Sequence, residues 1–452
     1  MKIIIIGCGR VGETLAGKLN GDGNDVTIID MSAAKVNEIS SRYDIMGVIG
    51  NGATQAAQQE AGVENADLLI AVTNSDELNL LCCVVAKREG NCHTIARVKN
   101  PEYSKETPYL KQQLGLDMVI NPEYVSAEEI ARVLRFPAAI KIEPFAKGKV
   151  ELIKFRLSKE SCLIGVSVKE MMMKYRSDIL VGTIERGDDA HIASGDFRFE
   201  EKDVVSIIAS PANANDFFKK IHYKGNTIKD ALVVGGGIIT HYLCELLEQE
   251  GIALKVVERD LKICEDLCAR WQKVDVIHGK GTDRELLMEE GITKAGAFVA
   301  LSNLDEENIL LSLCAKELRE EGKLITKINR TDYDSVINKL DFDTVICPIN
   351  ITSDIILRYV RATKNALGSN VETLYNVIPN KVEAAEFIVK ENSPIAGIPL
   401  MQLKLKKDVL IASISRGNQV IIPRGHDVIQ AGDAVVIVSK QLGMQDVTDV
   451  LK

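Results

Sequence analysis

The sequence predicts an α/β protein with two doubly wound lobes of mostly parallel sheet, each followed by a small α+β lobe. Three observations predict this fold. A β-branched run of strand length, Lys2–Ile6, leads into a glycine motif and then a helical pattern, as at the start of a β-α-β unit. The same arrangement returns 228 residues later. A strand-rich segment of about half the length follows each copy.

Composition limits the possible classes of protein. The 452 residues are 46% hydrophobic and 26% charged, which is the balance of a folded protein with cores to bury. A net charge of −9 argues against nucleic acid as a partner. The longest stretch without Asp, Glu, Lys or Arg, residues 45–59, is rich in Gly, Asn, Gln and Ala, so we expect no membrane span. The first strand leaves no room for a signal peptide, and we expect a cytoplasmic protein.

The ten cysteines are scattered and do not form a disulfide framework. Cys264 and Cys268, followed by His278, raise the question of a metal, but no second pair completes a zinc spacing. We therefore interpret the buried cysteines as small hydrophobic residues and predict no metal site.

The chain is an internal repeat. Gly7 matches Gly235 and Asp30 matches Glu258, while later segments match at an offset of 229: IGNGAT answers HGKGTD, and AVTNSDELNLL answers ALSNLDEENILL. A second pair, beginning at Val150 and Val382, is interleaved. The order is therefore large lobe, small lobe, large lobe, small lobe. We predict domains at 1–136, 138–222, 228–365 and 370–452. The segments Pro137–Lys149 and Asn365–Lys381 contain Pro, Gly or Asn and are interpreted as linkers.

Apolar runs and helical patterns alternate along the first large lobe. Val11, Leu15 and Leu19 give the first helix its apolar face. Parallel strands require such helical crossovers, so a doubly wound sheet follows. The strands predicted after the first are Val26–Ile29, Val48–Ile49, Leu68–Val72, Ile95–Val98 and Val119–Ile120.

The first glycine motif predicts a dinucleotide site. It is a GxGxxG sequence, and Asp30 ends the second strand 23 residues after its first glycine. Gly7 makes the tight turn, Gly9 lets the backbone approach a pyrophosphate, and Gly12 permits close packing of helix and strand. The N-terminus of the helix favours phosphates, and Asp30 favours a free ribose hydroxyl, hence NAD over NADP. The alternative is a turn that merely needs glycine. The motif residues are Gly7, Cys8, Gly9, Arg10, Val11 and Gly12.

The second copy of the motif is less regular. Thr240 replaces the third glycine, and its β-branched side chain is expected to push the helix away from the sheet and weaken binding. Glu258 keeps the acid at the same spacing, but Arg259 follows it and softens the exclusion of a phosphate. The candidate residues here are Gly235, Gly236, Gly237, Ile238, Ile239 and Glu258.

Further polar residues stand where strands end, at the edge where open sheets bind ligands. Thr73-Asn74 and Ser302-Asn303 fit contacts to a ribose or nicotinamide, with helix N-caps as the alternative. Arg97 and Lys327 fit contacts to a diphosphate, with solvated surface charges as the alternative. Two acidic pairs are interpreted as first-turn residues that complement the helix dipole, Asp76-Glu77 and Asp305-Glu306.

With these motifs and their four-part order, the whole chain resembles the cytosolic potassium-transport regulators of the KTN/RCK type, in particular the peripheral subunits of Trk uptake systems. The resemblance implies Rossmann-like large lobes that bind NAD+/NADH or ATP/ADP. It implies self-association into a homo-oligomeric ring, a dimer or a tetramer, that gates a Trk/Ktr-type membrane potassium translocator. The cofactor residues that it carries over are Gly7–Val11, Asp30, Thr73, Asn74, Arg97, Gly235–Ile239 and Glu258.

A dehydrogenase on the same nucleotide fold is the rival interpretation. Hydride transfer needs an acid or base near the nicotinamide, and His191 and His222 have no evident partners in sequence. We therefore predict no catalytic residues and no enzyme. The small lobes are expected either to dimerise or to serve as packing modules. Hinges are expected in amphipathic helices at Glu128–Pro137 and Asp354–Leu367, with ordinary C-terminal helices as the alternative.

Overall fold

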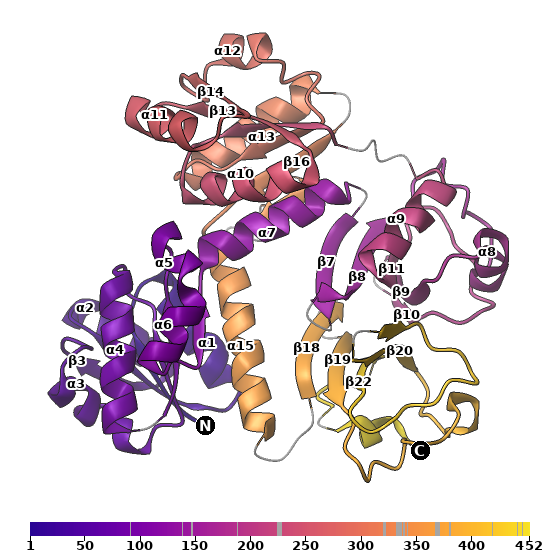
Figure 1. Cartoon of the computed structure of the whole chain (residues 1–452), viewed down its shortest axis with the longest axis horizontal. Coiled ribbons are helices and arrows are strands. Elements are labelled where there is room, and N and C mark those ends of the chain that lie inside the picture. Colours follow the sequence, from indigo (N-terminus) through magenta and orange to yellow (C-terminus); the bar gives the residue numbers. More distant parts are fainter. Residues whose placement is uncertain are drawn as a thin grey trace. The chain divides into compact units, whose positions relative to one another are not determined.

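The structure, a computed structural model, describes residues 1–452 except 91, 138, 146–147, 188, 224–227, 320–321, 331–336, 338–339, 341, 367–370, 379–380, 418, 441 and 445. The chain divides into two compact units, each built from two separate segments (Figure 1). The first unit comprises Met1–Ala131 and Ile228–Leu357, and the second comprises Arg132–Thr227 and Arg358–Lys452. The two large lobes thus belong to one unit and the two small lobes to the other.

The first large lobe is a six-stranded parallel sheet in the order β3-β2-β1-β4-β5-β6. Ile3 lies opposite both Val26 and Leu68, so the chain leaves the carboxyl end of β1 at the point where the strand order reverses. The strands are β1 (Lys2–Ile6), β2 (Asp25–Asp30), β3 (Met46–Ile49), β4 (Leu68–Ala71), β5 (His93–Arg97) and β6 (Met118–Ile120). The helices are α1 (Arg10–Gly21), α2 (Ala33–Tyr43), α3 (Gln55–Glu60), η1 (Val63–Asn65), α4 (Asp76–Glu89), α5 (Pro101–Lys105), α6 (Thr107–Leu114) and α7 (Pro122–Arg135).

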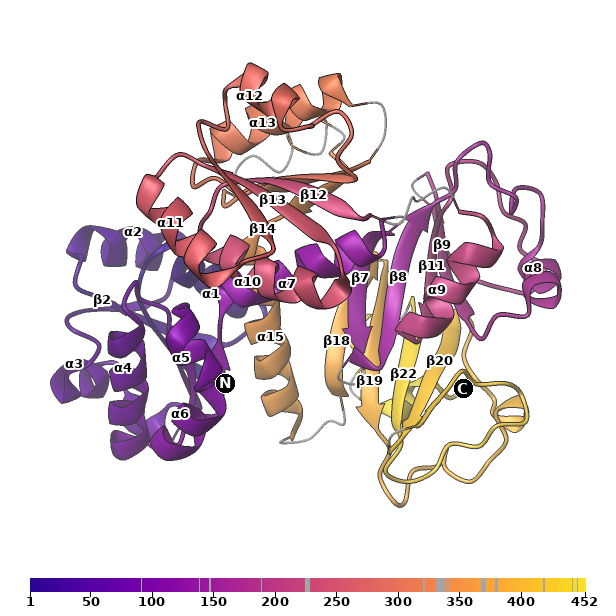
Figure 2. The same cartoon turned by 45° about the horizontal axis from the view of Figure 1, so that its top comes forward.

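The second large lobe repeats this topology as β14-β13-β12-β15-β16-β17. Its strands β14, β13 and β12 lie side by side in Figure 2. Its strands are β12 (Asp230–Val234), β13 (Ala253–Glu258), β14 (Val274–His278), β15 (Ala297–Ala300), β16 (Lys323–Lys327) and β17 (Thr344–Ile346). Its helices are α10 (Ile238–Glu250), α11 (Leu261–Arg270), α12 (Arg284–Glu289), α13 (Asp305–Leu318) and α15 (Pro348–Ala366). The predicted pair of doubly wound parallel sheets is confirmed.

Within the first unit, the two large lobes contact each other through their glycine-motif helices. The hydroxyl of Tyr242 on α10 donates to the carbonyl oxygen of Lys99 at 3.3 Å and accepts from Asn121 Nδ2 at 2.8 Å. The ring of Tyr242 packs edge-on against Tyr124, 5.3 Å between centroids. Lys18 on α1 forms a 2.9 Å ion pair with Asp354 on α15. None of these contacts could be predicted from the sequence.

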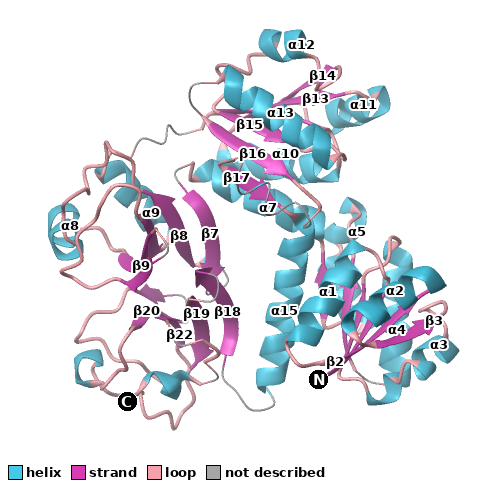
Figure 3. Cartoon of the chain, turned by 180° about the vertical axis from the view of Figure 1, so that it is seen from behind, coloured by secondary structure: helices cyan, strands magenta, loops and turns pink. Residues whose placement is uncertain are grey.

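The second unit holds two five-stranded antiparallel sheets, in the orders β10-β9-β11-β8-β7 and β18-β19-β22-β20-β21 (Figure 3). The first small lobe contains β7 (Ala139–Phe145), β8 (Val150–Arg156), α8 (Val168–Tyr175), β9 (Leu180–Arg186), β10 (Asp189–Ile192), β11 (Val204–Ala209) and α9 (Pro211–Lys220). The second contains β18 (Val371–Ile378), β19 (Val382–Ile388), η3 (Leu400–Gln402), β20 (Val409–Arg416), β21 (Gln419–Ile421), β22 (Ala434–Ser439) and η4 (Val447–Val450).

The prediction of linkers at Pro137–Lys149 and Asn365–Lys381 was wrong, because each segment contains an edge strand. β7 pairs with β8 and β18 pairs with β19. Pro144 is tolerated because β7 lies at the edge of its sheet, where a strand does not need every N–H group. The small lobes differ in their helices: the first has α8, whereas Leu400–Gln402 in the second forms only the 3-10 turn η3.

The two small lobes share a hydrophobic core within the second unit. Phe145 on β7 and Tyr375 on β18 lie 4.7 Å apart between ring centroids. The Tyr375 hydroxyl donates to the carbonyl oxygen of Pro144 at 2.8 Å. Val150, Leu152, Val382 and Ala384 belong to the same buried cluster. The small lobes therefore associate with each other inside one chain.

The two helices expected as hinges are present and amphipathic. Ile130, Val133 and Leu134 are buried on α7, and Ile356 and Val360 are buried on α15. Both helices begin earlier than predicted, and the boundary between the two compact units falls inside each of them. Their role as hinges stays a prediction, as do the four domain ranges; Leu367 and positions 138 and 370 lie outside the described residues.

Candidate functional site

The first glycine turn connects β1 to α1 at the carboxyl edge of the sheet. Gly7 has φ +107°, which side-chain-bearing residues rarely adopt, and a Cβ there would lie 3.0 Å from the backbone nitrogen of Thr73. Its N–H donates to the Ile29 carbonyl oxygen at 2.8 Å. The turn is thus held between β2 and the end of β4, and only glycine fits there.

Gly9 and Gly12 have opposite surroundings. A Cβ on Gly9 would meet nothing within 4 Å, whereas a Cβ on Gly12 would lie 1.9 Å from the Gly7 carbonyl oxygen. Gly12 is therefore needed for packing, while Gly9 opens onto free space. Gly9 is also the N-cap of α1, and no described side chain caps that helix end. Uncapped N–H groups beside an open glycine fit the pyrophosphate of a dinucleotide.

The carboxylate of Asp30 holds the glycine turn in place. One oxygen accepts from the Cys8 N–H at 2.7 Å and the other from the Ser32 N–H at 2.8 Å. A carboxylate oxygen has a second lone pair, so these bonds leave room for a ribose hydroxyl. The ribose role stays a prediction. Burial and the charge of Asp30 raise the pKa of the Cys8 thiol to about 12, so this thiol stays protonated at neutral pH.

At the end of β4, a buried asparagine organises the backbone. Asn79 Oδ1 accepts from the N–H and the hydroxyl of Thr73, at 2.8 and 2.7 Å. Asn79 Nδ2 donates to the carbonyl oxygens of Thr73 and Arg97. Thr73 is therefore not the helix N-cap; that position belongs to Ser75, while Asn74 is exposed. In the second copy, Asn308 Oδ1 accepts from the Ser302 N–H and Asn308 Nδ2 donates to the Lys327 carbonyl oxygen. The N-cap of α13 is Leu304, so neither Ser302 nor the exposed Asn303 caps that helix.

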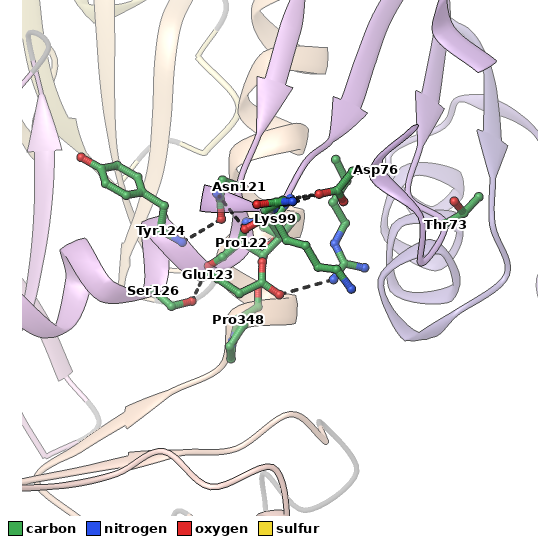
Figure 4. Close-up of polar contacts among 12 residues, drawn as sticks. Thr73, Asp76, Lys99, Asn121, Pro122, Glu123, Tyr124, Ser126 and Pro348 are labelled. Carbon is green, nitrogen blue, oxygen red and sulfur yellow. Dashed lines mark hydrogen bonds and ion pairs between the residues drawn. The ribbon is translucent and has the colours of Figure 1, made fainter. Parts of the chain in front are cut away.

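Asp76 does more than complement a helix dipole, so the first-turn interpretation was incomplete. Its side chain is buried and accepts from the N–H groups of Lys99 at 3.0 Å and Asn100 at 2.8 Å (Figure 4). Asp305 binds the two equivalent N–H groups in the second copy. Each aspartate therefore joins the loop that follows the fifth strand of its sheet to the start of the helix that follows the fourth strand. The repeated Asp-x-x-Asn spacing in both copies was the available signal.

Neither strand-end cation is a freely solvated surface charge. Arg97 is largely buried and its guanidinium lies 3.5 Å from a Glu123 carboxylate oxygen (Figure 4). Lys327 is 6% exposed, and its ammonium donates to the Leu301 carbonyl oxygen at 3.3 Å. Burial lowers the pKa of Lys327, although Asp305 and Glu123 act in the opposite direction. The predicted contacts to a diphosphate remain untested.

The second glycine turn reproduces the first with one change. Gly235 has φ +108°, and a Cβ on Gly237 would meet nothing within 4 Å. Glu258 accepts from the N–H groups of Gly236 at 2.6 Å and Asp260 at 2.9 Å. Gly237 is the N-cap of α10, and the other two candidates, Ile238 and Ile239, form its first turn.

Thr240 occupies the position of Gly12 without a clash. Its hydroxyl donates to the Gly235 carbonyl oxygen at 2.5 Å. In the first copy a Cβ on Gly12 would lie 1.9 Å from the Gly7 carbonyl oxygen, whereas Thr240 is hydrogen-bonded to the equivalent oxygen of its own turn. A larger separation of α10 from its turn stays a prediction. Its effect on affinity stays a prediction.

The described residues lack two features that other functions require. No group of three or more His, Cys, Asp or Glu in this part of the chain could hold a metal ion. No helix within it combines the length and hydrophobicity needed to cross a bilayer. His191 stacks near Phe197 in the second unit, 5.2 Å between ring centroids.

Comparisons with known proteins match the alternating organisation. The model of the TrkA-N domain matches residues 3–122 and 231–348, and that of the TrkA-C domain matches 152–222 and 384–452. The chain is 34% identical to the Trk system potassium uptake protein TrkA homolog 1 of Methanosarcina mazei, over 100% of both chains. It is 32% identical to the Trk system potassium uptake protein TrkA of Halomonas elongata, over 97% of this chain and 95% of that one.

Among solved structures, the GsuK channel bound to NAD is similar in fold. It matches with a TM-score of 0.65 and 15% identity, covering 97% of this chain and 77% of the other. Identity at this level supports the tandem fold alone.

Proposed function

The chain belongs to the family built from TrkA-N and TrkA-C domains, and on this premise we propose that it is the nucleotide-binding regulatory subunit of a potassium uptake transporter. The observation that carries the proposal is the start of α1. An uncapped helix end, an open glycine and a fixed acid stand together at the carboxyl edge of a parallel sheet. Open α/β sheets bind nucleotides at this place.

We assign NAD(H) as the ligand of the first large lobe. The N–H groups at the start of α1 bind the pyrophosphate and Asp30 binds the adenosine ribose. Thr73, Asn74 and Arg97 lie on the side of the site that receives the nicotinamide half of the dinucleotide. ATP and ADP share the adenosine and phosphate groups and use the same residues. The second lobe binds at Gly235–Ile239 and Glu258, more weakly because the side chain of Thr240 stands where the first lobe has Gly12.

The regulatory step in this proposal is a ligand-dependent change in the arrangement of lobes. A ligand shifts such an equilibrium only by its different affinities for the two arrangements. The helices α7 and α15 suit the role of hinges because each runs from one compact unit into the other. The partners are a Trk/Ktr-type membrane translocator and further copies of this chain in a ring. The protein then acts at the cytoplasmic face of the membrane.

Titration calorimetry with NADH on the full chain tests the proposal. We expect binding that is lost from the first lobe in Gly9→Ala and from the second in Gly237→Ala. No steady NADH oxidation should accompany it. Sustained oxidation that disappears with Gly9→Ala would favour the rival dehydrogenase. Purification from membranes without any potassium-transporting partner would contradict the regulatory role.

A further inference from the structure

The two large lobes differ in chemistry where their second and third strands end. Asp30 on β2 pairs with Ile49 on β3, and at the matching positions Glu258 on β13 pairs with His278 on β14. In dinucleotide-binding folds, the acid at this strand end marks the adenosine ribose. Side chains that follow the acid, and those that end the third strand, therefore flank the ribose 2′ position.

In the first lobe these flanking side chains are neutral. Met31 follows the acid and is 75% exposed, and Ile49 is 54% exposed. Asn51, two residues after Ile49, is also exposed. At these three positions the first lobe therefore offers a phosphate one amide donor, Asn51, and no positive charge.

In the second lobe the matching side chains are Arg259, His278 and Lys280, and all three are exposed. His278 Nε2 lies 3.1 Å from the Arg259 carbonyl oxygen, which fixes the ends of the two strands side by side. Within the described chain, neither Arg259 nor Lys280 forms an ion pair, although exposed basic side chains elsewhere on the lobe, such as Lys273, do. Two cations are thus available to an incoming group.

The acid itself does not distinguish the lobes, because Asp30 and Glu258 are held identically. Each binds one N–H of its glycine turn and one N–H two residues ahead. The surroundings do distinguish them. The charged side chains close to the acid in sequence and at the end of the third strand sum to zero in the first lobe. Those at the matching positions of the second lobe sum to one positive charge, with His278 not counted. The charges are Asp30 and Lys35 in the first lobe, and Glu258, Arg259, Asp260, Lys262 and Lys280 in the second.

We propose that the second large lobe is a site for an adenine dinucleotide whose ribose carries a 2′-phosphate, the class of NADP(H), while the first selects the unphosphorylated class. This rests on the proposed nucleotide function and assigns a different ligand to its second site. Arg259 and Lys280 bind the 2′-phosphate, because arginine and lysine are the side chains that form charge-assisted bonds with phosphate. The chain then senses two nucleotide pools with two unlike sites.

The experiment uses the full chain with the first site blocked by Gly9→Ala, titrated with NADPH and with NADH. We expect NADPH to bind the second lobe at least as tightly as NADH. Arg259→Ala combined with Lys280→Ala should weaken NADPH about ten- to a hundredfold and leave NADH within about threefold, because charge-assisted bonds to the 2′-phosphate are lost. Lys294→Ala is a control for the loss of a positive charge away from the site, since this exposed lysine precedes β15 at the amino edge of the same sheet.

The outcomes separate this inference from the function on which it rests. NADH binding with NADPH at least tenfold weaker, unaffected by the double substitution, overturns the inference and leaves nucleotide regulation standing. Binding of neither dinucleotide to the second lobe overturns both the inference and that lobe's proposed site. In the reciprocal test, Met31→Arg should raise the NADPH affinity of the first lobe in a Gly237→Ala background.

Discussion

Gly9→Ala should separate ligand binding from folding in the first large lobe. Gly9 has φ −79° and ψ −178°, which alanine adopts readily, and its Cβ would meet nothing within 4 Å. Alanine is a poorer N-cap than glycine but restricts the unfolded chain, so the net change in unfolding free energy should stay within about 1 kcal/mol. The midpoint of thermal unfolding should then move by about 2–4 °C at most.

The same methyl group fills the space into which a pyrophosphate must come. Loss of one or two charge-assisted N–H bonds, each of about 1.5–3 kcal/mol, should weaken NADH binding about ten- to ten-thousandfold. Calorimetry on a Gly237→Ala background isolates the first site, and thermal unfolding of the same samples reports stability. Unchanged NADH affinity in a folded Gly9→Ala protein would refute the placement of the pyrophosphate at α1.

Gly12→Ala is the matched comparison. Its Cβ would lie 1.9 Å from the carbonyl oxygen of Gly7 and 3.0 Å from its carbon, both backbone atoms. We expect a loss of stability of about 1–3 kcal/mol together with lost binding. A Gly12→Ala protein as stable as the parent would contradict the close packing of α1 on its turn.

Three further predictions concern single side chains. Asp30→Asn should weaken NADH binding about ten- to a hundredfold and also lower the thermal midpoint, because the carboxylate holds two N–H groups of the turn as well as the ribose. Tyr242→Phe should lower the midpoint by about 2–4 °C, since the buried Asn121 amide loses the shorter of its two hydrogen bonds and keeps only the 3.5 Å bond to the Lys99 carbonyl oxygen; Thr14→Val, whose hydroxyl bonds within its own helix, should change it less. Burial lowers the pKa of His241, so the folded state resists its protonation, and stability should fall as the pH drops below about 6.5; unfolding midpoints of His241→Gln across pH 5–8 should be flatter.

Most of the large-lobe fold could be predicted because it depends on local and periodic patterns. The buried strands are nearly continuous apolar runs, and the glycine turns combine steric and phosphate-binding requirements in a short motif. The edge strands β7 and β18 escaped prediction because an edge strand tolerates charge and proline. Pro144 and Lys141 there are typical of loops as well as of protected edges.

The site was less predictable because its supports come from distant parts of the chain. Asn79 binds a backbone group at the last residue of β5 and Asp76 binds backbone groups just after it, about twenty residues away. A single sequence shows only that such residues suit a helix start. The sequence shows that both residues recur as Asp305 and Asn308. The backbone groups that they bind, which explain the repeat, are brought to them only by the tertiary structure. The same is true of Tyr242, whose partners lie in the other lobe.

The division of each compact unit between two distant segments has a consequence for the protein's synthesis. Residues 1–131 leave the ribosome well before residues 228–357, with which they complete the first unit. At about 5–20 residues per second, the 226 residues between positions 131 and 357 take on the order of 10–45 s. For the first part of that interval, until residue 242 has been made, the Asn121 and Tyr124 surface lacks Tyr242, and another nascent copy on the same message can supply it. The nascent chain thus passes through a stage in which pairing within one polypeptide competes with pairing between two, and the rate of translation influences which is formed.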